Sequence, residues 1–226
     1  MKEKPSEKYL GDKLSTNPAV SVDETVKDRY WRVMSGILEI RSVMKDVRID
    51  VVGGLQAGID LFEVGVLPIL LNNAESWTEI RNDTLKKLED LQLTMIRYLF
   101  NTMRSTSSVA LLWESCMLPI KARIDIKKLC FLHHIVNLDD TELAKEIYKE
   151  QKRSSLPGLV KETQELIKLY NLPQVSSNNT DGSTISKLSW KIEVKKAVKL
   201  SVGNELKDKA LKLSKLKENE IMNEEY

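Results

Sequence analysis

The fold class is decided by residues 22–46, which read VDETVKDRYWRVMSGILEIRSVMKD. Apolar side chains recur in this stretch at alternating steps of four and three residues, at Val26, Tyr30, Val33, Ile37, Ile40 and Met44. That spacing places them on one face of an α-helix. Ser21 and Glu24 have the spacing of a capping box, in which each side chain satisfies a free amide of the first helical turn. We therefore expect an amphipathic helix over residues 22–46.

Further segments with helical character follow along the chain. We expect Gly53-Gly54 to end the first unit and residues 55–74 to form a helix that is buried on most sides and kinked at Pro68. The apolar patterns predict more helices over residues 84–99, 107–113, 119–136, 140–147 and 159–170. Few glycines and prolines interrupt them. The sequence therefore predicts an all-α protein, an irregular multi-helix bundle.

The two ends of the chain differ from this central part. Residues 1–20 are polar and broken, and we expect a short extended segment there. Residues 174–184 are rich in Ser, Asn, Thr, Asp and Gly, which is typical of a linker. Beyond the linker, Ile185, Leu188, Ile192 and Val198 alternate with many lysines. We expect residues 185–226 to form a separate basic helical tail, and the central part to divide into residues 21–104 and 105–173.

The overall charge gives no sign of a preferred partner. The 226 residues include 35 basic and 33 acidic side chains, for a formal net charge of +2. Any binding to nucleic acid must therefore depend on local patches. The apolar run from Val64 to Leu71 is short and contains Pro68, so we expect no membrane span. Two isolated cysteines and a charged N-terminus favour an intracellular protein, cytoplasmic or nuclear.

No catalytic arrangement can be recognised. The two histidines, His133 and His134, are adjacent in a predicted helix and point about 100° apart, so they cannot grip one metal ion. We interpret His133 as a core residue and His134 as a surface residue. Glu89 and Asp90 are interpreted as part of a solvated helix face. We expect no metal, no cofactor and no enzymatic activity of this chain alone.

Basic side chains gather in three places. They lie on the first helix, near the start of the helix after Pro119, and in the tail. The two later clusters consist of Lys121, Arg123, Lys127 and Lys128, and of Lys187, Lys191, Lys195, Lys196 and Lys199. Two interpretations stay open, because such side chains either solvate a helix face or contact phosphates.

Several short motifs recur in an order that is characteristic of one family. They are Lys8-Tyr9-Leu10-Gly11-Asp12, Leu71-Asn72-Asn73-Ala74-Glu75-Ser76-Trp77, Leu88-Glu89-Asp90-Leu91-Gln92, Leu112-Trp113-Glu114, Leu118-Pro119-Ile120, Phe131-Leu132-His133-His134-Ile135, Leu156-Pro157-Gly158 and Ser189-Trp190-Lys191. Together they resemble the region downstream of the polymerase active site in reverse transcriptases of non-LTR (LINE-like) retrotransposons. The resemblance covers residues 7 to about 217.

The resemblance implies a place for each segment. Residues 1–20 would carry the edge of the primer grip, and residues 21–104 would be the thumb, which holds the primer–template duplex. Thumb contacts depend on shape and charge rather than on base reading. The implied nucleic-acid-binding residues are Tyr9, Leu10, Gly11, Lys27, Arg29, Arg32 and Arg41. Trp77 and Trp113 are interpreted as core anchors.

The sequence departs from the family in one decisive respect. The Tyr-Ala-Asp-Asp-type turn that holds the catalytic metal ions is not present, and neither is the endonuclease. The expected function is thus that of a non-catalytic fragment that binds RNA or an RNA–DNA hybrid. Without the palm, apolar surface should be exposed and favour self-association. The alternative is a helical interaction or structural module that does not bind nucleic acid.

Overall fold

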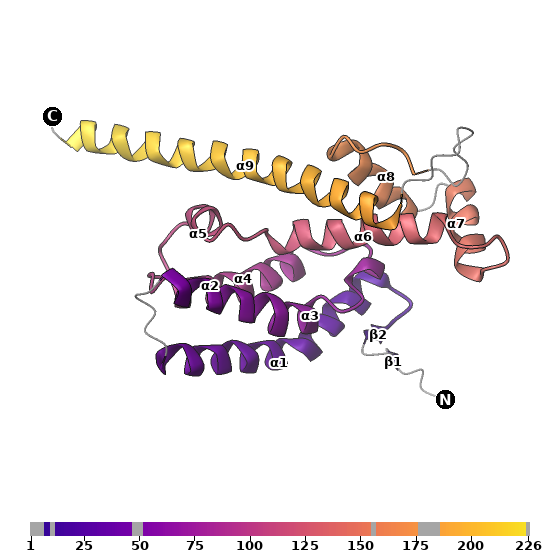
Figure 1. Cartoon of the computed structure of the whole chain (residues 1–226), viewed down its shortest axis with the longest axis horizontal. Coiled ribbons are helices and arrows are strands. Elements are labelled where there is room, and N and C mark those ends of the chain that lie inside the picture. The colour runs from indigo at the N-terminus through magenta and orange to yellow at the C-terminus, as the bar shows by residue number, and fades with distance from the viewer. Residues whose placement is uncertain (1–6, 10–11, 47–51, 155–156, 176–185, 225–226) are drawn as a thin grey trace.

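The part of the chain that the structure describes consists of helices, connecting turns and one short hairpin. The computed structural model describes residues 7–9, 12–46, 52–154, 157–175 and 186–224. The hairpin consists of β1 (Glu7–Tyr9) and β2 (Asp12–Leu14). The helical elements are α1 (Pro18–Asp46), α2 (Val52–Leu61), the π-helix η1 (Phe62–Val66), α3 (Leu67–Leu70), the 3-10 helix η2 (Ala74–Ser76), α4 (Asn82–Leu99), α5 (Ser108–Glu114), α6 (Ile120–Val136), α7 (Leu143–Ser154), α8 (Leu159–Leu169) and α9 (Lys187–Glu224). The predicted all-α class is confirmed (Figure 1).

The hairpin is antiparallel and fastened to α1. Tyr9 pairs with Asp12 in the register of the two strands. The backbone amide of Lys13 donates a hydrogen bond to the Thr25 hydroxyl on α1 at 2.8 Å. A short extended segment was predicted here, and residues 7–9 and 12–14 confirm it. Residues 1–6, 10 and 11 lie outside the described part of the chain.

Helix α1 begins earlier than predicted. The Asn17 side-chain oxygen accepts hydrogen bonds from the amides of Ala19 at 3.0 Å and Val20 at 3.4 Å, so Asn17 is the N-cap. Pro18 suits the first turn, where an amide hydrogen is not needed. The predicted capping box of Ser21 and Glu24 is therefore wrong. The apolar stripe is confirmed, because its members from Val26 to Met44 are buried except for the half-buried Tyr30.

The second helical segment is irregular in the region of Pro68. Gly53-Gly54 does not end a unit, because both glycines lie inside α2. The chain then widens into η1, where the Leu67 amide donates to the Phe62 carbonyl five residues earlier. Pro68 follows directly, and its missing amide hydrogen and its ring disfavour regular α-helical bonding to the preceding turn. The prediction that the segment is buried on most sides is wrong, since Val64 is 78% exposed.

One stretch of the described helices could cross a membrane by length and composition alone. It runs from Gly53 to Leu70, and 39% of it is buried inside the fold. The expectation that the chain has no membrane span stays a prediction.

Two apolar cores share α6. The first core includes side chains from α1 to α5 and takes Ile120 and Ile124 from α6. The second core includes α8 and α9 and takes Ala122, Leu129 and Leu132 from other faces of α6. The cores therefore do not follow the predicted boundary at residues 104 and 105. Helix α6 lies between the two groups of helices in Figure 1.

Helix α9 packs on the body by a face that the sequence pattern did not reveal. Its buried stripe is Trp190, Val194, Val198 and Val202. Leu188 and Ile192, which the sequence pattern grouped with Val198 as the apolar residues of this segment, are 68% and 59% exposed. The helix continues through Gly203, and its first half belongs to the second core. Its far end extends beyond the other helices (Figure 1). Of the predicted linker, residues 176–184 lie outside the described chain, as does Ile185.

The aromatic and histidine predictions are partly confirmed. His133 is buried and stacks on Trp190, with 5.6 Å between ring centroids, whereas His134 is exposed. Trp77 is a core residue, 4% exposed. Trp113 is 43% exposed, so its predicted role as a core anchor is wrong.

Candidate nucleic-acid interface

Arg29, one of the residues implied by the resemblance, is buried. Its side chain is 2% exposed. The guanidinium forms an ion pair with Asp12 of β2 and donates to the carbonyl oxygens of Leu70 at 3.3 Å and Asn72 at 2.6 Å. It also lies 5.6 Å from the ring centroid of Trp77. The predicted phosphate contact of Arg29 is therefore wrong, because the guanidinium faces the protein and joins the hairpin, α1 and the end of α3.

The other three cations of α1 that the resemblance implies, Lys27, Arg32 and Arg41, are exposed and contact neighbouring side chains. Lys27 pairs with Asp23 at 2.6 Å and Arg32 with Asp28 at 3.1 Å. Arg41 lies over the ring of Tyr98, 5.0 Å from its centroid. The hydrogen bond from Lys27 lowers the pKa of Asp23, so this carboxyl is ionised at neutral pH and offsets the lysine charge. Lys27 and Arg32 are thus compensated by carboxylates of the same helix, whereas Arg41 is held against an aromatic ring and keeps its charge.

The three residues at the predicted primer-grip edge are described only in part. The backbone of Tyr9 belongs to β1. Leu10 and Gly11 lie outside the described residues. Asp12, directly after them, accepts hydrogen bonds from Arg29 and, at 2.9 Å, from the Asn73 side chain. The first residue of β2 is therefore held in place by polar contacts with α1 and with the segment after α3.

The basic cluster of α6 is neutralised within the fold. Each of its four cations has an acidic partner from α6 or a neighbouring element. The pairs are Lys121–Asp125, Arg123–Glu63, Lys127–Glu75 and Lys128–Glu162. These pairs connect α6 with η1, η2 and α8. For this cluster the interpretation as phosphate contacts loses support.

The tail lysines differ from both other clusters. Lys187, Lys191, Lys195 and Lys199 stand at four-residue intervals on α9, and all four are exposed. We call them the lysine row. Within the part of the chain that the structure describes, no ion pair involves any of them. Burial raises the pKa of the nearby Cys130 thiol on α6, and Lys191, Lys195 and Lys187 act against that rise. The row thus follows the seam between α9 and α6.

A groove lies beside the lysine row. It has a volume of about 680 Å³ and is bounded by α2, η1, α3, the loop before α6, α6 itself and α9. Lys195 and Lys199 line it on the α9 side, and Arg123 and Lys127 on the α6 side. Glu63 of the π-helix lines the opposite wall. π-Helical turns are often found at functional sites.

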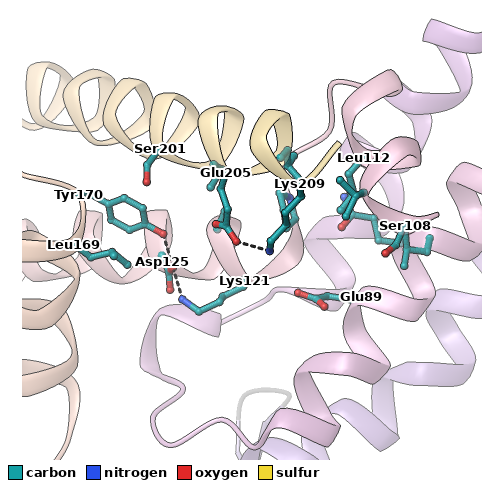
Figure 2. Close-up of a pocket in the computed structure, with 17 residues that line it drawn as sticks. Glu89, Ser108, Leu112, Lys121, Asp125, Leu169, Tyr170, Ser201, Glu205 and Lys209 are labelled. Carbon is teal, nitrogen blue, oxygen red and sulfur yellow. Dashed lines mark hydrogen bonds and ion pairs between the residues drawn. The ribbon is translucent and has the colours of Figure 1, made fainter. Parts of the chain in front are cut away.

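A second cavity, of about 420 Å³, lies between the two cores and holds a network of polar side chains. The buried carboxylate of Asp125 accepts hydrogen bonds from the Tyr170 hydroxyl and from Lys121, both at 2.8 Å (Figure 2). Across the cavity, Lys209 pairs with Glu205 at 2.5 Å. The Tyr170–Asp125 hydrogen bond connects the end of α8 to α6, whereas the Lys209–Glu205 pair lies within α9.

Glu89 is the carboxylate of this cavity that sequence reasoning misplaced. It is half-buried and lines the cavity, so the predicted solvated face is wrong for Glu89, whereas it is confirmed for Asp90, which is exposed. Burial raises its pKa, and the neighbouring Asp90 adds to the rise. Its burial depends on α5 and α9, which are distant in sequence. Of the lining residues, the pattern of the chain alone singled out neither Asp125 nor Tyr170.

A search of the described residues for metal sites finds no group of three or more His, Cys, Asp or Glu side chains that could hold an ion. No family model, no curated protein and no solved structure matches this chain.

Proposed function

We propose that the chain binds nucleic acid through the lysine row of α9 and the adjoining groove, without a catalytic step of its own. The observation that carries the proposal is the set of four exposed lysines at four-residue intervals that lack acidic partners among the described residues. The resemblance to the region after the palm of LINE-like reverse transcriptases supports it, since that region contacts nucleic-acid backbones. The resemblance alone implied a binding surface on α1, and the surface proposed here is on α9.

The spacing of the row suits a phosphate backbone. A rise of 1.5 Å per residue places Lys187 and Lys199 roughly 18 Å apart along α9, about the length of five phosphates of one strand at 3.4 Å each. Like charges four residues apart destabilise a helix by about 0.2–0.5 kcal/mol per pair, so three such pairs together cost roughly 1 kcal/mol. Bound phosphates would remove that repulsion and release counterions.

The alternative function is a helical interaction module that does not bind nucleic acid. It is favoured by the outer face of α1, where Trp31 and Leu38 are 75% and 53% exposed. Seven residues apart, they lie on the same side of the helix. A partner protein, or a second copy of the chain, would cover such apolar side chains.

A salt titration separates the two functions. Affinity for an RNA and for an RNA–DNA hybrid is measured by filter binding at several salt concentrations, with the full chain. We expect binding that weakens as salt rises. Changing all four lysines of the row to Gln should make the negative slope of log K against log salt shallower by roughly 3, because each phosphate contact contributes about 0.7–0.9 to its magnitude.

The matched control changes four other exposed lysines to Gln, namely Lys45, Lys86, Lys152 and Lys161. This control alters the net charge equally but leaves the lysine row intact. Equal weakening in both variants would show that the row is not the binding surface. Absence of binding to either nucleic acid would reject the proposal and leave the interaction module. Circular dichroism of both variants establishes that they are folded.

A further inference from the structure

The groove beside the lysine row combines a charged rim with an apolar floor. Seven apolar side chains line it, from α2, α3 and the residue after it, the loop before α6 and α6: Ile59, Leu67, Pro68, Leu71, Met117, Leu118 and Ile126. Leu118 and Ile126 are half-buried and so present apolar surface to the groove. Phosphates alone would gain nothing from such a floor, because apolar surface is favourable only against another apolar group.

We infer that this groove takes an unpaired base of a single-stranded nucleic acid, while phosphates of the same strand lie along Lys195 and Lys199. The inference rests on the proposed function and adds the class of nucleic acid. A base has apolar faces and a polar edge, whereas a duplex keeps its bases stacked inside and offers mainly sugar and phosphate to a protein. Single-stranded nucleic acid therefore matches both the floor and the rim.

The dimensions of the groove agree with this occupant. Its volume of about 680 Å³ is within the range of pockets that enclose a small organic molecule, roughly 300–1,000 Å³. A single nucleotide is a small organic molecule of this class, whereas a double helix is far too large for the groove. The adjoining part of the lysine row would then follow the strand out of the groove.

The rim also offers hydrogen bonds for the edge of a base. The side chain of Asn72, which is exposed, lines the groove and provides amide donors and a carbonyl acceptor. The backbone carbonyl of Asn72 accepts from Arg29, so the residue is anchored at its main chain while its side chain stays at the surface. This arrangement is suited to hold a base without demanding one identity.

Two ion pairs fix the walls of the groove. Arg123 of α6 pairs with Glu63 of η1, and Lys127 of α6 pairs with Glu75 of η2 at 3.0 Å. They connect η1, which lines the groove, and η2, which lies outside its lining, to α6, and they leave these two cations largely compensated. The excess positive charge at the rim therefore comes from α9, through Lys195 and Lys199.

The test compares three ligands of equal length with the full chain, by fluorescence anisotropy at one salt concentration. They are a single-stranded RNA, the same sequence as a blunt RNA–DNA duplex, and a sugar–phosphate strand without bases. We expect the single strand to bind about tenfold more tightly than the other two, because only its unpaired bases can cover the apolar floor. Equal affinities for the single strand and the duplex would overturn the inference and leave the proposed function standing. No binding of any of the three would overturn both.

Variants locate the effect in the groove. Ile126→Asn should lower single-strand affinity several-fold and leave duplex affinity unchanged, because it makes the floor polar. Its control is Ile147→Asn, at a 50% exposed position on α7. If Ile126→Asn does not fold, Asn72→Ala at the rim replaces it and should also lower the affinity for the single strand. The comparison with the base-free strand tests the inference without any variant. Tight binding of a poly-glutamate peptide, equal to that of the RNA, would overturn the inference in favour of an acidic protein partner.

Discussion

Replacement of Arg29 by Met tests whether this arginine serves the fold or a ligand. Methionine keeps much of the aliphatic length but removes the guanidinium. The carbonyl oxygens of Leu70 and Asn72 lose their donor, and Asp12, whose side chain is 14% exposed, loses its counterion. Asp12 keeps the hydrogen bond from Asn73.

The expected cost follows from these contacts. Removal of one partner of a buried ion pair destabilises a protein by about 3–5 kcal/mol. Because Asp12 retains one donor and some contact with water, we expect a value near the lower end, about 3 kcal/mol. For a chain of this length that corresponds to a fall in Tm of roughly 6–12 °C.

The assay is urea denaturation followed by circular dichroism at neutral pH. The matched control is Arg32→Met, one turn along the same helix, where an exposed pair with Asp28 contributes only about 0.3–0.5 kcal/mol. If the two variants lose the same free energy of unfolding, the structural role given to Arg29 is refuted. The role as a phosphate contact predicts the opposite pattern, weaker nucleic-acid binding by a variant of unchanged stability.

Three further changes probe the core and the polar network. Asp23→Asn should lower stability at neutral pH, because Lys27 keeps the pKa of Asp23 below its usual 3.8. The difference in unfolding free energy between the two proteins should vanish as the pH falls through that lowered pKa, and urea titrations of both proteins over a pH series measure it. Trp190→Ala should cost about 3–5 kcal/mol of stability, because it leaves a cavity in the second core and removes the 3.0 Å hydrogen bond to the Leu129 carbonyl. Hydrogen exchange should show the loss of protection in α9, and a cost under about 1 kcal/mol would contradict the burial of Trp190. Tyr170→Phe should cost about 1.5–3 kcal/mol, because the buried carboxylate of Asp125 loses a donor; unchanged stability in urea would show that this hydrogen bond is dispensable.

Local patterns predicted the helices well where one face of a helix is buried against a single core. The stripe of α1 is an example, since its spacing alone identifies Val33 and Met44 as buried. The start of α1 was mispredicted because two capping signals compete within five residues. Ser21 and Glu24 match a capping box, but Asn17 followed by Pro18 begins the helix one turn earlier.

Positions that depend on distant partners could not be predicted from spacing. Arg29 and Arg32 look alike in sequence, but only Arg29 meets Asp12 and the carbonyl groups after α3. On α9, the exposed Leu188 gave the same apolar signal as the buried Val198, and the choice between faces is made by α6 and α8. The tail lysines were recognised as a cluster, but the groove beside them is formed by three separate parts of the chain, residues 56–72, 115–127 and 195–199.

The sharing of α6 by two cores makes the chain difficult to divide. A fragment that ends at Val136 would present Leu129 and Leu132 to water, since their partners belong to α8 and α9. A fragment that begins at Ile120 would carry Ile120 and Ile124 without the helices that cover them. Neither half retains a closed apolar interior, so both should aggregate when produced alone. For the same reason the intact chain should unfold in one cooperative transition, with one midpoint for probes placed in either half.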